Sequence, residues 1–239
     1  MKINGLQKLT LLDFPGHVAC TVFLAGCNLR CPFCHNSDLL TAEAEAVMDD
    51  ASLLTFLKSR QGLLEGVAFT GGEPLMRAGL PELMEKIRAL GYPVKLDTNG
   101  CFPDRLKDVV RAGLVDYVAM DIKNSKERYA VTVGFDDGED TGEAAFDLAP
   151  VEESVRFLLE GTVDYEFRTT TVNELHDEDS FRGIGAWIAG ARRYYLQPFT
   201  DRDTVLYAGL TTPQPETLER YRSIVAPFVR EVHIRGELD

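Results

Sequence analysis

Short apolar segments alternate with amphipathic segments along most of the chain, and this alternation is the feature that most restricts its fold. The apolar segments have the length and the Val, Ile and Phe content of buried strands, whereas the amphipathic ones have helical periodicity and end near glycine or proline. The expected strands are residues 17–25, 65–70, 93–100, 116–123, 164–172, 193–199 and a short last one at 229–236. The expected helices are residues 51–62, 80–91, 104–113, 151–161, 179–190 and 215–228. Such alternation predicts right-handed βαβ units and a parallel sheet.

No linker rich in Pro, Gly and Ser divides this pattern, so we expect residues 1–239 to form a single domain. One acidic, glycine-containing segment, 133–147, departs from the alternation and predicts a solvated insert loop at about 133–150. Its carboxylates lack the alternating spacing of an EF-hand calcium loop. A partner-docking loop is the alternative that the sequence leaves open.

The formal net charge of −13 argues against non-specific binding to nucleic acid, because no excess of Lys and Arg is available for phosphates. The chain contains no run of about 18 apolar residues, so no membrane span is expected. The first residues, MKINGLQKLTLLDFPGH, have neither the apolar core nor the cleavage site of a signal peptide, and a cytoplasmic location is expected. Thiols stay reduced there, so clustered cysteines indicate metal binding or redox catalysis before a disulfide.

Chemically capable residues follow the ends of the expected strands. In chain order they are a cysteine cluster, GGEP (71–74), DTNG (97–100), DIK (121–123), Arg168 within the fifth strand and QPF (197–199). The carboxyl ends of parallel strands share one rim, where ligands bind. Polar residues often end a single strand, but a purely structural protein has no need of them at six successive strands. The pattern therefore predicts one ligand-binding mouth.

Three of the five cysteines lie within CNLRCPFCHN (27–36), with the spacing C-x3-C-x2-C. A structural zinc site normally has four ligands, and His35 directly follows Cys34, so it is poorly placed to be the fourth. A thioredoxin-like site would use Cys31 and Cys34 and would leave Cys27 without a role. Beside zinc, a redox pair and a disulfide, the fourth alternative is an iron–sulfur cluster. Three thiolates would leave one iron of a [4Fe–4S] cluster open for a substrate or cofactor.

These segments resemble the signature motifs of the radical S-adenosylmethionine (SAM) superfamily. In that superfamily C-x3-C-x2-C binds a [4Fe–4S] cluster, an aromatic residue such as Phe33 precedes the third cysteine, and a glycine-rich motif similar to TGGEP binds SAM. CNLRCPFCHN, LDTNG and MDIK, in this order, are similar to the activating enzymes of glycyl radical enzymes. GLQKLTLLDFPGHVACTVFLAGC, DYEFRTTTVNELHDEDSF, YYLQPF and VHIRG resemble a subgroup, the anaerobic ribonucleoside-triphosphate reductase activating proteins. The resemblance covers nearly the whole chain except the acidic insert.

The resemblance assigns a role to each motif. Cys27, Cys31 and Cys34 would bind the [4Fe–4S] cluster, and SAM would chelate its fourth iron through amino and carboxylate groups. Phe33 and His35 would lie near the adenine or the cluster.

The remaining SAM contacts would come from the strand ends. Gly71 and Gly72 would let the backbone approach the ligand closely, and Glu73 would pair with the amino group of SAM. Lys123 and Arg168 are the natural counter-charges for the SAM carboxylate.

The aspartates of the DTNG and DIK motifs help to bind a monovalent cation near SAM in the activating enzymes. By this resemblance, Asp97, Thr98 and Asp121 are candidate oxygen ligands of such a cation, and Asp121 would also support the SAM contacts.

We therefore expect an α/β fold, a partial open (β/α)6 barrel of the radical SAM type with a parallel sheet and a cluster loop after the first strand. The expected activity generates a glycyl radical on a partner enzyme, with anaerobic ribonucleoside-triphosphate reductase as the first choice and a pyruvate formate-lyase type enzyme as the alternative. The reaction needs a low-potential electron donor such as flavodoxin or ferredoxin. Two other possibilities remain: a radical SAM enzyme acting on a small molecule or peptide, and an iron–sulfur electron-transfer or sensing protein.

Overall fold

The computed structural model describes residues 1–135 and 145–236. Its main sheet has eight strands in the order β10-β9-β8-β7-β6-β5-β3-β2. Neighbouring strands pair in parallel, except that β2 pairs antiparallel with β3. The strands are β2 (Gly5–Thr10), β3 (Ala19–Leu24), β5 (Gly66–Gly71), β6 (Val94–Thr98), β7 (Tyr117–Asp121), β8 (Asp164–Thr171), β9 (Arg193–Pro198) and β10 (Glu231–Ile234). β1 (Lys2–Ile3) and β4 (Met48–Asp49) form a separate antiparallel pair.

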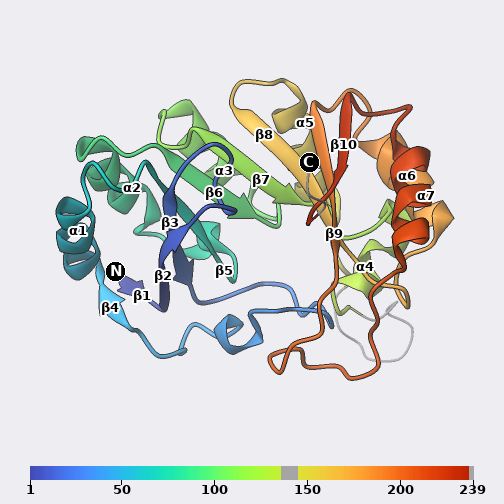
Figure 1. The fold of residues 1–239 in the computed structure, drawn as a ribbon, viewed down its shortest axis with the longest axis horizontal. Helices are drawn as coiled ribbons and strands as arrows, with labels where there is room; N and C mark the ends of the chain where they lie inside the picture. The colour runs from blue at the N-terminus through green and yellow to red at the C-terminus, as the bar shows by residue number, and fades with distance from the viewer. Residues whose placement is uncertain (136–144, 237–239) are drawn as a thin grey trace.

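Helices connect successive parallel strands and cover the outer face of the curved sheet (Figure 1). The connecting helices are α1 (Asp50–Ser59), α2 (Leu80–Ala89), α3 (Pro103–Arg111), α5 (Ala149–Leu159), α6 (Glu178–Trp187) and α7 (Pro215–Val225). A short α4 (Tyr129–Thr132) and three 3-10 turns, η1 (Ser37–Leu39), η2 (Pro74–Met76) and η3 (Lys126–Arg128), lie between them. Six strand–helix units from β3 to α7, followed by β10, make the expected (β/α)6 barrel. It stays open because its edge strands, β2 and β10, do not pair with each other.

The pattern of apolar and amphipathic segments gave every parallel strand and every connecting helix to within a few residues. The prediction omitted β2, where the structure adds an antiparallel strand at the edge of the sheet. Gln7, Lys8 and Leu9 of this strand are exposed, so it lacks the apolar alternation that marks a half-buried strand.

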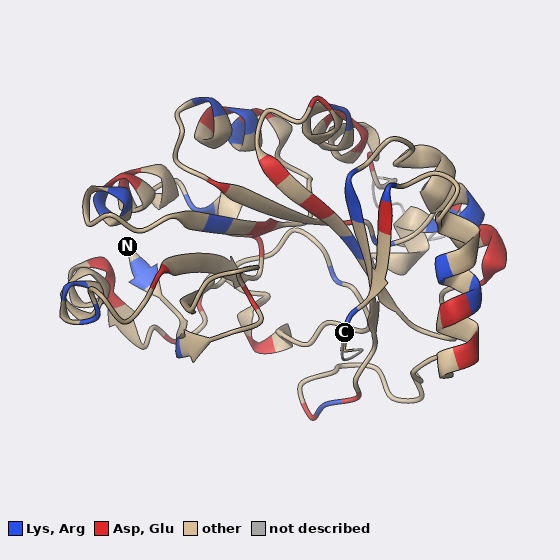
Figure 2. Cartoon of the chain, turned by 45° about the horizontal axis from the view of Figure 1, so that its top comes forward, with Lys and Arg blue, Asp and Glu red and all other residues tan. Residues whose placement is uncertain are grey.

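The two faces of the sheet differ in polarity. On β6, Val94 and Leu96 point to the helices and join the main hydrophobic core, whereas Lys95 and Asp97 point into the interior of the barrel. Figure 2 shows that the strands carry charged residues as well as the helices. A barrel of this kind is normally filled by branched apolar side chains. The polar interior here marks a binding chamber.

Most of the expected acidic loop, residues 136–144, lies outside the described residues. On either side of it, the rings of Phe135 and Phe146 are 5.2 Å apart, and Phe146 stacks on Tyr129. Within the described part of the chain, no helix is both long enough and apolar enough to cross a membrane.

Candidate functional site

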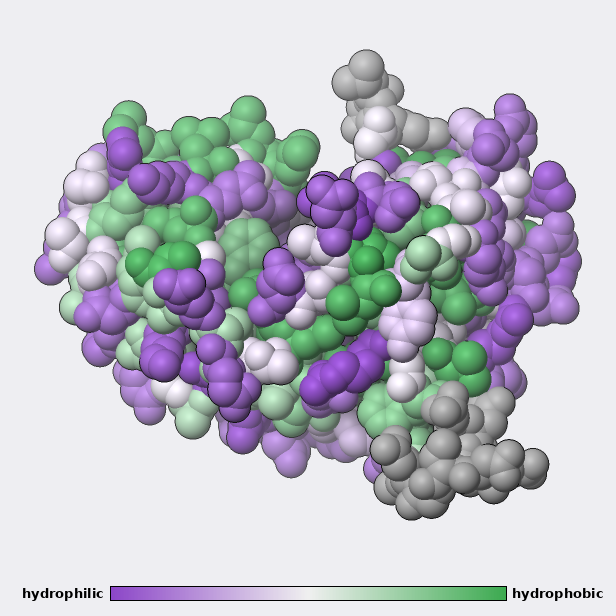
Figure 3. Space-filling view, turned by 90° about the horizontal axis from the view of Figure 1, so that it is seen from below, coloured by the Kyte–Doolittle hydropathy of each residue, from purple (hydrophilic) through white to green (hydrophobic). Residues whose placement is uncertain are grey.

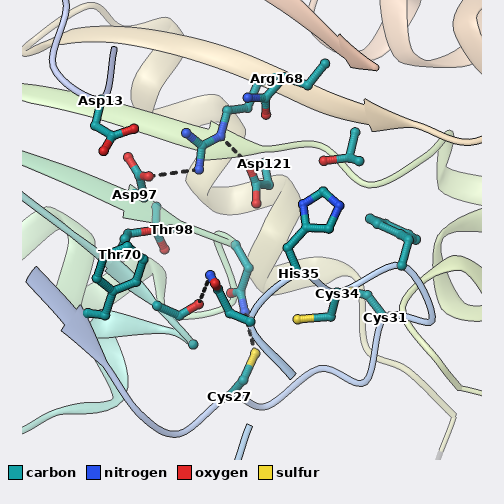
Figure 4. Close-up of a pocket in the computed structure, with 18 of the residues that line it drawn as sticks. Asp13, Cys27, Cys31, Cys34, His35, Thr70, Asp97, Thr98, Asp121 and Arg168 are labelled. Atoms are coloured by element: carbon teal, nitrogen blue, oxygen red, sulfur yellow. Dashed lines mark hydrogen bonds and ion pairs between the residues drawn. The ribbon is translucent and has the colours of Figure 1, made fainter. Parts of the chain in front are cut away.

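A cavity of about 480 Å³ lies inside the curved sheet and opens at the carboxyl ends of the parallel strands (Figure 4). Twelve of the thirteen residues predicted at the mouth line it, and Glu73 is the exception. The twelve are Cys27, Cys31, Phe33, Cys34, His35, Gly71, Gly72, Asp97, Thr98, Asp121, Lys123 and Arg168. Residues far apart in the sequence thus meet in one chamber, as the placement of polar groups at strand ends predicted.

The three cysteines of the predicted cluster loop all face this cavity, and none is in a disulfide. Burial raises the pKa of the Cys31 thiol to about 12, so the thiolate forms there only with a compensating positive charge such as a coordinated metal. Within the described ranges, no three Cys, His, Asp or Glu side chains are close enough together to hold one metal ion. This argues against a closed zinc site. Three separate thiolates around one chamber fit a larger group, in which each thiolate binds a different iron.

Gly71 and Gly72 allow the end of β5 to lie directly against the start of the cluster loop. Gly71 has φ +118°, and a Cβ there would lie 2.4 Å from the carbonyl oxygen of Leu24. A Cβ on Gly72 would lie 2.2 Å from the carbonyl oxygen of Gly26. The Glu73 amide donates a 2.7 Å hydrogen bond to that same oxygen. We expected these glycines to let a ligand approach the backbone closely. In the structure they let the end of β5 approach the backbone that precedes Cys27.

Glu73 is fully buried and joins the GGEP turn to the DTNG turn. Its carboxylate accepts hydrogen bonds from the amide of Leu75 (3.0 Å), the hydroxyl of Thr98 (2.9 Å) and the amide of Asn99 (2.7 Å). Burial outweighs these bonds and raises the pKa of Glu73 to about 7. Its carboxylate therefore holds the two loops together behind the wall of the cavity, and does not face a ligand in the chamber.

Five charged side chains on β6, on β8 and at the end of β7 form a continuous charged ladder, which we define as Lys95, Asp97, Arg168, Asp121 and Lys123. Lys95 forms an ion pair with Asp97, and the Nη2 atom of Arg168 lies 3.1 Å from the Oδ2 atom of Asp97. Arg168 Nε donates to Asp121 Oδ1 at 2.5 Å, and Lys123 Nζ donates to Asp121 Oδ2 at 2.6 Å. Figure 4 shows Arg168 between the two aspartates.

The ladder keeps its carboxylates ionised. Burial raises the pKa of Asp97 and Asp121, but the nearby cations, Arg168 foremost, hold both pKa values below their usual range. Burial alone would lower the pKa of Lys123, but the neighbouring Asp121 carboxylate outweighs burial, so the pKa of Lys123 is raised. The side chains predicted to meet the SAM carboxylate are therefore present as fixed charges at neutral pH.

His35 lines the cavity and also fastens the loop that follows β9. Its Nε2–H donates to the carbonyl of Thr200 at 2.7 Å, and its ring stacks on Phe199 with centroids 5.5 Å apart. The Thr204 hydroxyl donates to the His35 carbonyl at 2.7 Å, and the hydroxyl of Ser37 donates to the carbonyl of Thr204. Phe33 is buried beside Lys123, whose ammonium lies 5.8 Å from the centre of the ring.

Several residues of the cavity wall escaped the sequence prediction. Asp13 accepts a 2.5 Å hydrogen bond from Thr21, and Leu12 lines the cavity next to it. Arg235 also lines it and pairs with the buried Glu166 at 2.7 Å. Asp13 lies in a turn between strands and Arg235 follows the last strand, so strand-end reasoning could have found only Arg235.

Sequence similarity to known proteins extends over most of the chain. Residues 21–180 match the sequence model of the Radical SAM superfamily. A Methanocaldococcus jannaschii protein, provisionally described as a glycyl-radical enzyme activating enzyme, is 26% identical over 242 residues, which cover 98% of this chain and 95% of that protein. The 7-carboxy-7-deazaguanine synthase of Methanopyrus kandleri is 26% identical over 240 residues, covering 89% of this chain and 87% of that protein.

The fold is also similar to solved structures. Streptococcus suis SuiB, crystallised with S-adenosylmethionine, superposes with a TM-score of 0.67 at 10% sequence identity. The match covers 90% of this chain and 52% of SuiB, so this chain corresponds to about half of that structure. At this identity the likeness concerns the fold alone.

Proposed function

The chain belongs to the radical SAM superfamily, and on that premise we propose that it is an activase, an enzyme that generates a glycyl radical on a partner protein. The partner that we propose is anaerobic ribonucleoside-triphosphate reductase, and the electron donor is a low-potential protein such as flavodoxin or ferredoxin. The observation that carries the proposal is that Cys27, Cys31 and Cys34 share one chamber with the charged ladder.

When bound, a [4Fe–4S] cluster would supply the electron that cleaves the sulfonium C–S bond of SAM into methionine and a 5′-deoxyadenosyl radical. That radical would take a hydrogen atom from a glycine of the partner, which gives 5′-deoxyadenosine and a glycyl radical. The residues of this chain bind, orient and shield the reactants. Cys27, Cys31 and Cys34 would hold the cluster at one end of the chamber. Cys31 is buried and Cys27 and Cys34 are half-buried, so a group held by them would be partly screened from water, which protects a reactive organic radical from side reactions.

The charged ladder suits the carboxylate of the methionine group of SAM. It contains three cations and two carboxylates, so it has one positive charge in excess. A single carboxylate brought in by a ligand would balance that charge, and the guanidinium of Arg168 offers planar donors for it. The hydrogen bond from Lys123 to Asp121 also orients the Lys123 ammonium, and Lys123 lines the cavity.

A protein substrate is supported by the surface beside the chamber. Leu11 and Leu12, in the turn between β2 and β3, are 68% and 82% exposed, and Leu12 also lines the cavity. Large apolar side chains exposed next to a site usually mark a protein interaction surface. Figure 3 shows further hydrophobic residues reaching the surface between hydrophilic ones on the face seen from below. The sheet around the cavity is open, because its edge strands β2 and β10 do not pair with each other.

A small-molecule substrate is the second candidate, and the M. kandleri deazaguanine synthase favours it, because that relative matches nearly as much of the chain at the same identity. Such an enzyme would cleave SAM in a manner that depends on a small substrate, and it would leave no stable radical on a second protein.

Anaerobic reconstitution with iron and sulfide, followed by reduction in the presence of SAM, tests the proposal. We expect 5′-deoxyadenosine and methionine, and a glycyl radical signal by electron paramagnetic resonance when anaerobic ribonucleoside-triphosphate reductase is added. Cys31→Ala should abolish all three products. Cys101→Ala is the matched control, because Cys101 is a free, half-buried thiol outside the cavity wall. SAM cleavage without a glycyl signal on this reductase or on pyruvate formate-lyase would favour the small-molecule candidate.

A further inference from the structure

The candidate ligands of a monovalent cation have their oxygen atoms already engaged by the protein. Oδ1 of Asp97 accepts from the ammonium of Lys95, and Oδ2 lies 3.1 Å from Arg168. The two carboxylate oxygens of Asp121 are held by Arg168 at 2.5 Å and by Lys123 at 2.6 Å. Each carboxylate thus has a protein cation on both oxygens, and a metal ion would have to displace one of them.

The third candidate, Thr98, is turned toward the loops behind the cavity wall. Its hydroxyl donates to Glu73 at 2.9 Å and accepts from the amide of Gly100 at 3.1 Å. The three oxygen ligands therefore do not converge on a common point, and they do not fit the cation site that the resemblance implies.

Lys95 is the unusual member of this arrangement. It lies on β6 two residues before Asp97, so both side chains project from the same face of the strand into the barrel. Its side chain is only 1% exposed, and Asp97 is its one hydrogen-bonding partner among the described residues. Burying an ammonium group is costly, and an apolar residue would fill this strand position at least as well for stability alone. A charge at this place therefore calls for a role in the site.

Among the five residues of the charged ladder, cations outnumber carboxylates, and the Asp13 carboxylate elsewhere in the cavity wall is engaged by the Thr21 hydroxyl. Lys95, Lys123 and Arg168 face Asp97 and Asp121, which leaves one positive charge for the SAM carboxylate to neutralise. The next acidic group along β8, Glu166, is already paired with Arg235 and adds nothing to the balance. A bound K⁺ or Na⁺ beside Asp97 would add a positive charge next to Lys95 and Arg168, and like charges at such short range repel.

We propose that the Lys95 ammonium permanently occupies the place of a monovalent cation beside Asp97, so that this enzyme binds SAM without K⁺ or Na⁺. The inference rests on the proposed SAM site. It makes Lys95 a positioning residue, which holds Asp97 and, through Asp97, the guanidinium of Arg168.

The test measures the dissociation constant of SAM for the reconstituted protein by anaerobic calorimetry. The buffers contain KCl, NaCl or tetramethylammonium chloride at one ionic strength, because the last cation is too large for an oxygen-lined site. For the wild type we expect values that agree within about twofold in all three salts. For Lys95→Met we expect binding weaker by about tenfold in tetramethylammonium, in the usual range of coupling between two ligands, and recovered in KCl or NaCl.

Lys107→Met is the matched control. Lys107 is ion-paired with Glu153 between α3 and α5 and lies outside the cavity wall, so its loss should leave the salt response of SAM binding unchanged. A second readout is the thermal unfolding midpoint of the protein without its cluster. For Lys95→Met this midpoint should be higher in KCl than in tetramethylammonium chloride, and for the wild type it should be the same in both salts. Lys95→Gln replaces Lys95→Met if the latter does not fold.

The wild-type series is decisive by itself. Wild-type binding that weakens by more than about fivefold in tetramethylammonium overturns the inference. So does a Lys95→Met protein that binds like the wild type in every salt, or one that no salt restores. If the wild type binds SAM in none of the salts, the proposed SAM site is wrong and the inference falls with it.

Discussion

Replacing Gly72 with alanine should damage the cluster loop without touching a cysteine. The added Cβ would lie 2.2 Å from the carbonyl oxygen of Gly26, 2.7 Å from its carbonyl carbon and 3.1 Å from the carbonyl oxygen of Leu39. Ordinary contacts of a Cβ begin at 3.4 Å, so the first distance is too short by more than 1 Å. All three atoms belong to the backbone, and no side-chain rotation can relieve the overlap.

The size of the effect follows from what must move. Overpacking of this kind costs about 1–3 kcal/mol. The Gly26 carbonyl also accepts the 2.7 Å hydrogen bond from the Glu73 amide, and losing a buried backbone bond costs about 1–3 kcal/mol more. We therefore expect Gly72→Ala to lower the free energy of unfolding by roughly 2–6 kcal/mol. Since Gly26 immediately precedes Cys27, the shift also displaces the first of the three proposed cluster ligands.

Two measurements check this expectation: urea unfolding of the protein without its cluster, and iron and sulfide bound per chain after reconstitution. The control is Gly79→Ala, where φ is −84° and the nearest atom to an added Cβ is the sulfur of Met1 at 3.8 Å. That change should cost less than about 1 kcal/mol and leave iron binding intact. A Gly72→Ala protein that matches Gly79→Ala in stability and iron content would refute the account of the GGEP turn given above.

Two other outcomes are expected. Burial raises the pKa of Glu73 from 4.5 to about 7, so the folded chain binds this proton more tightly than the unfolded chain, and stability is lost as pH rises through that interval. Relative to Glu73→Gln, the wild-type free energy of unfolding from urea titrations should fall by about 3 kcal/mol between pH 4.5 and pH 7, and parallel pH profiles would contradict the shift. Leu11→Ser, outside the cavity wall, should raise the KM for the partner reductase by about tenfold, with SAM cleavage unchanged. The exposed Leu206→Ser is its control, and an unaltered KM in Leu11→Ser would remove the turn from the docking surface.

The architecture was accessible from the sequence because its signals are local. The segment that became β5 (Gly66–Gly71), for example, is an apolar run that ends at a glycine, and α2 has a regular apolar face. β2 could not be found this way. Its residues gain their strand conformation by pairing with Thr21 and Val22, and an exposed edge strand leaves little apolar pattern to read.

The site was predictable in part for the same reason. The cysteine spacing, the polar strand ends and the family resemblance are visible in the sequence, and twelve of the thirteen residues predicted from them together line the cavity. The roles of Glu73, Lys95 and His35 were not visible, because each depends on contacts between distant segments. Glu73 occurs within a glycine-rich turn that suggests a ligand contact, yet Thr98 and Asn99 take up its carboxylate. Lys95 was simply one residue of an expected strand until the fold placed its partner Asp97 beside Arg168.

The fastening of the cluster loop to the loop after β9 bears on how the protein is made. The hydrogen bonds that join His35 and Ser37 to Thr200 and Thr204 connect residues 165 to 169 positions apart. At the usual pace of translation, roughly 10–30 s pass between synthesis of the cysteines and synthesis of the loop that steadies them. For that interval the nascent chain carries three thiols close together in a segment that lacks these hydrogen bonds to the loop after β9. Insertion of the iron–sulfur group is therefore best suited to a chain that has left the ribosome nearly complete, and oxygen has its best access to these thiols before that moment.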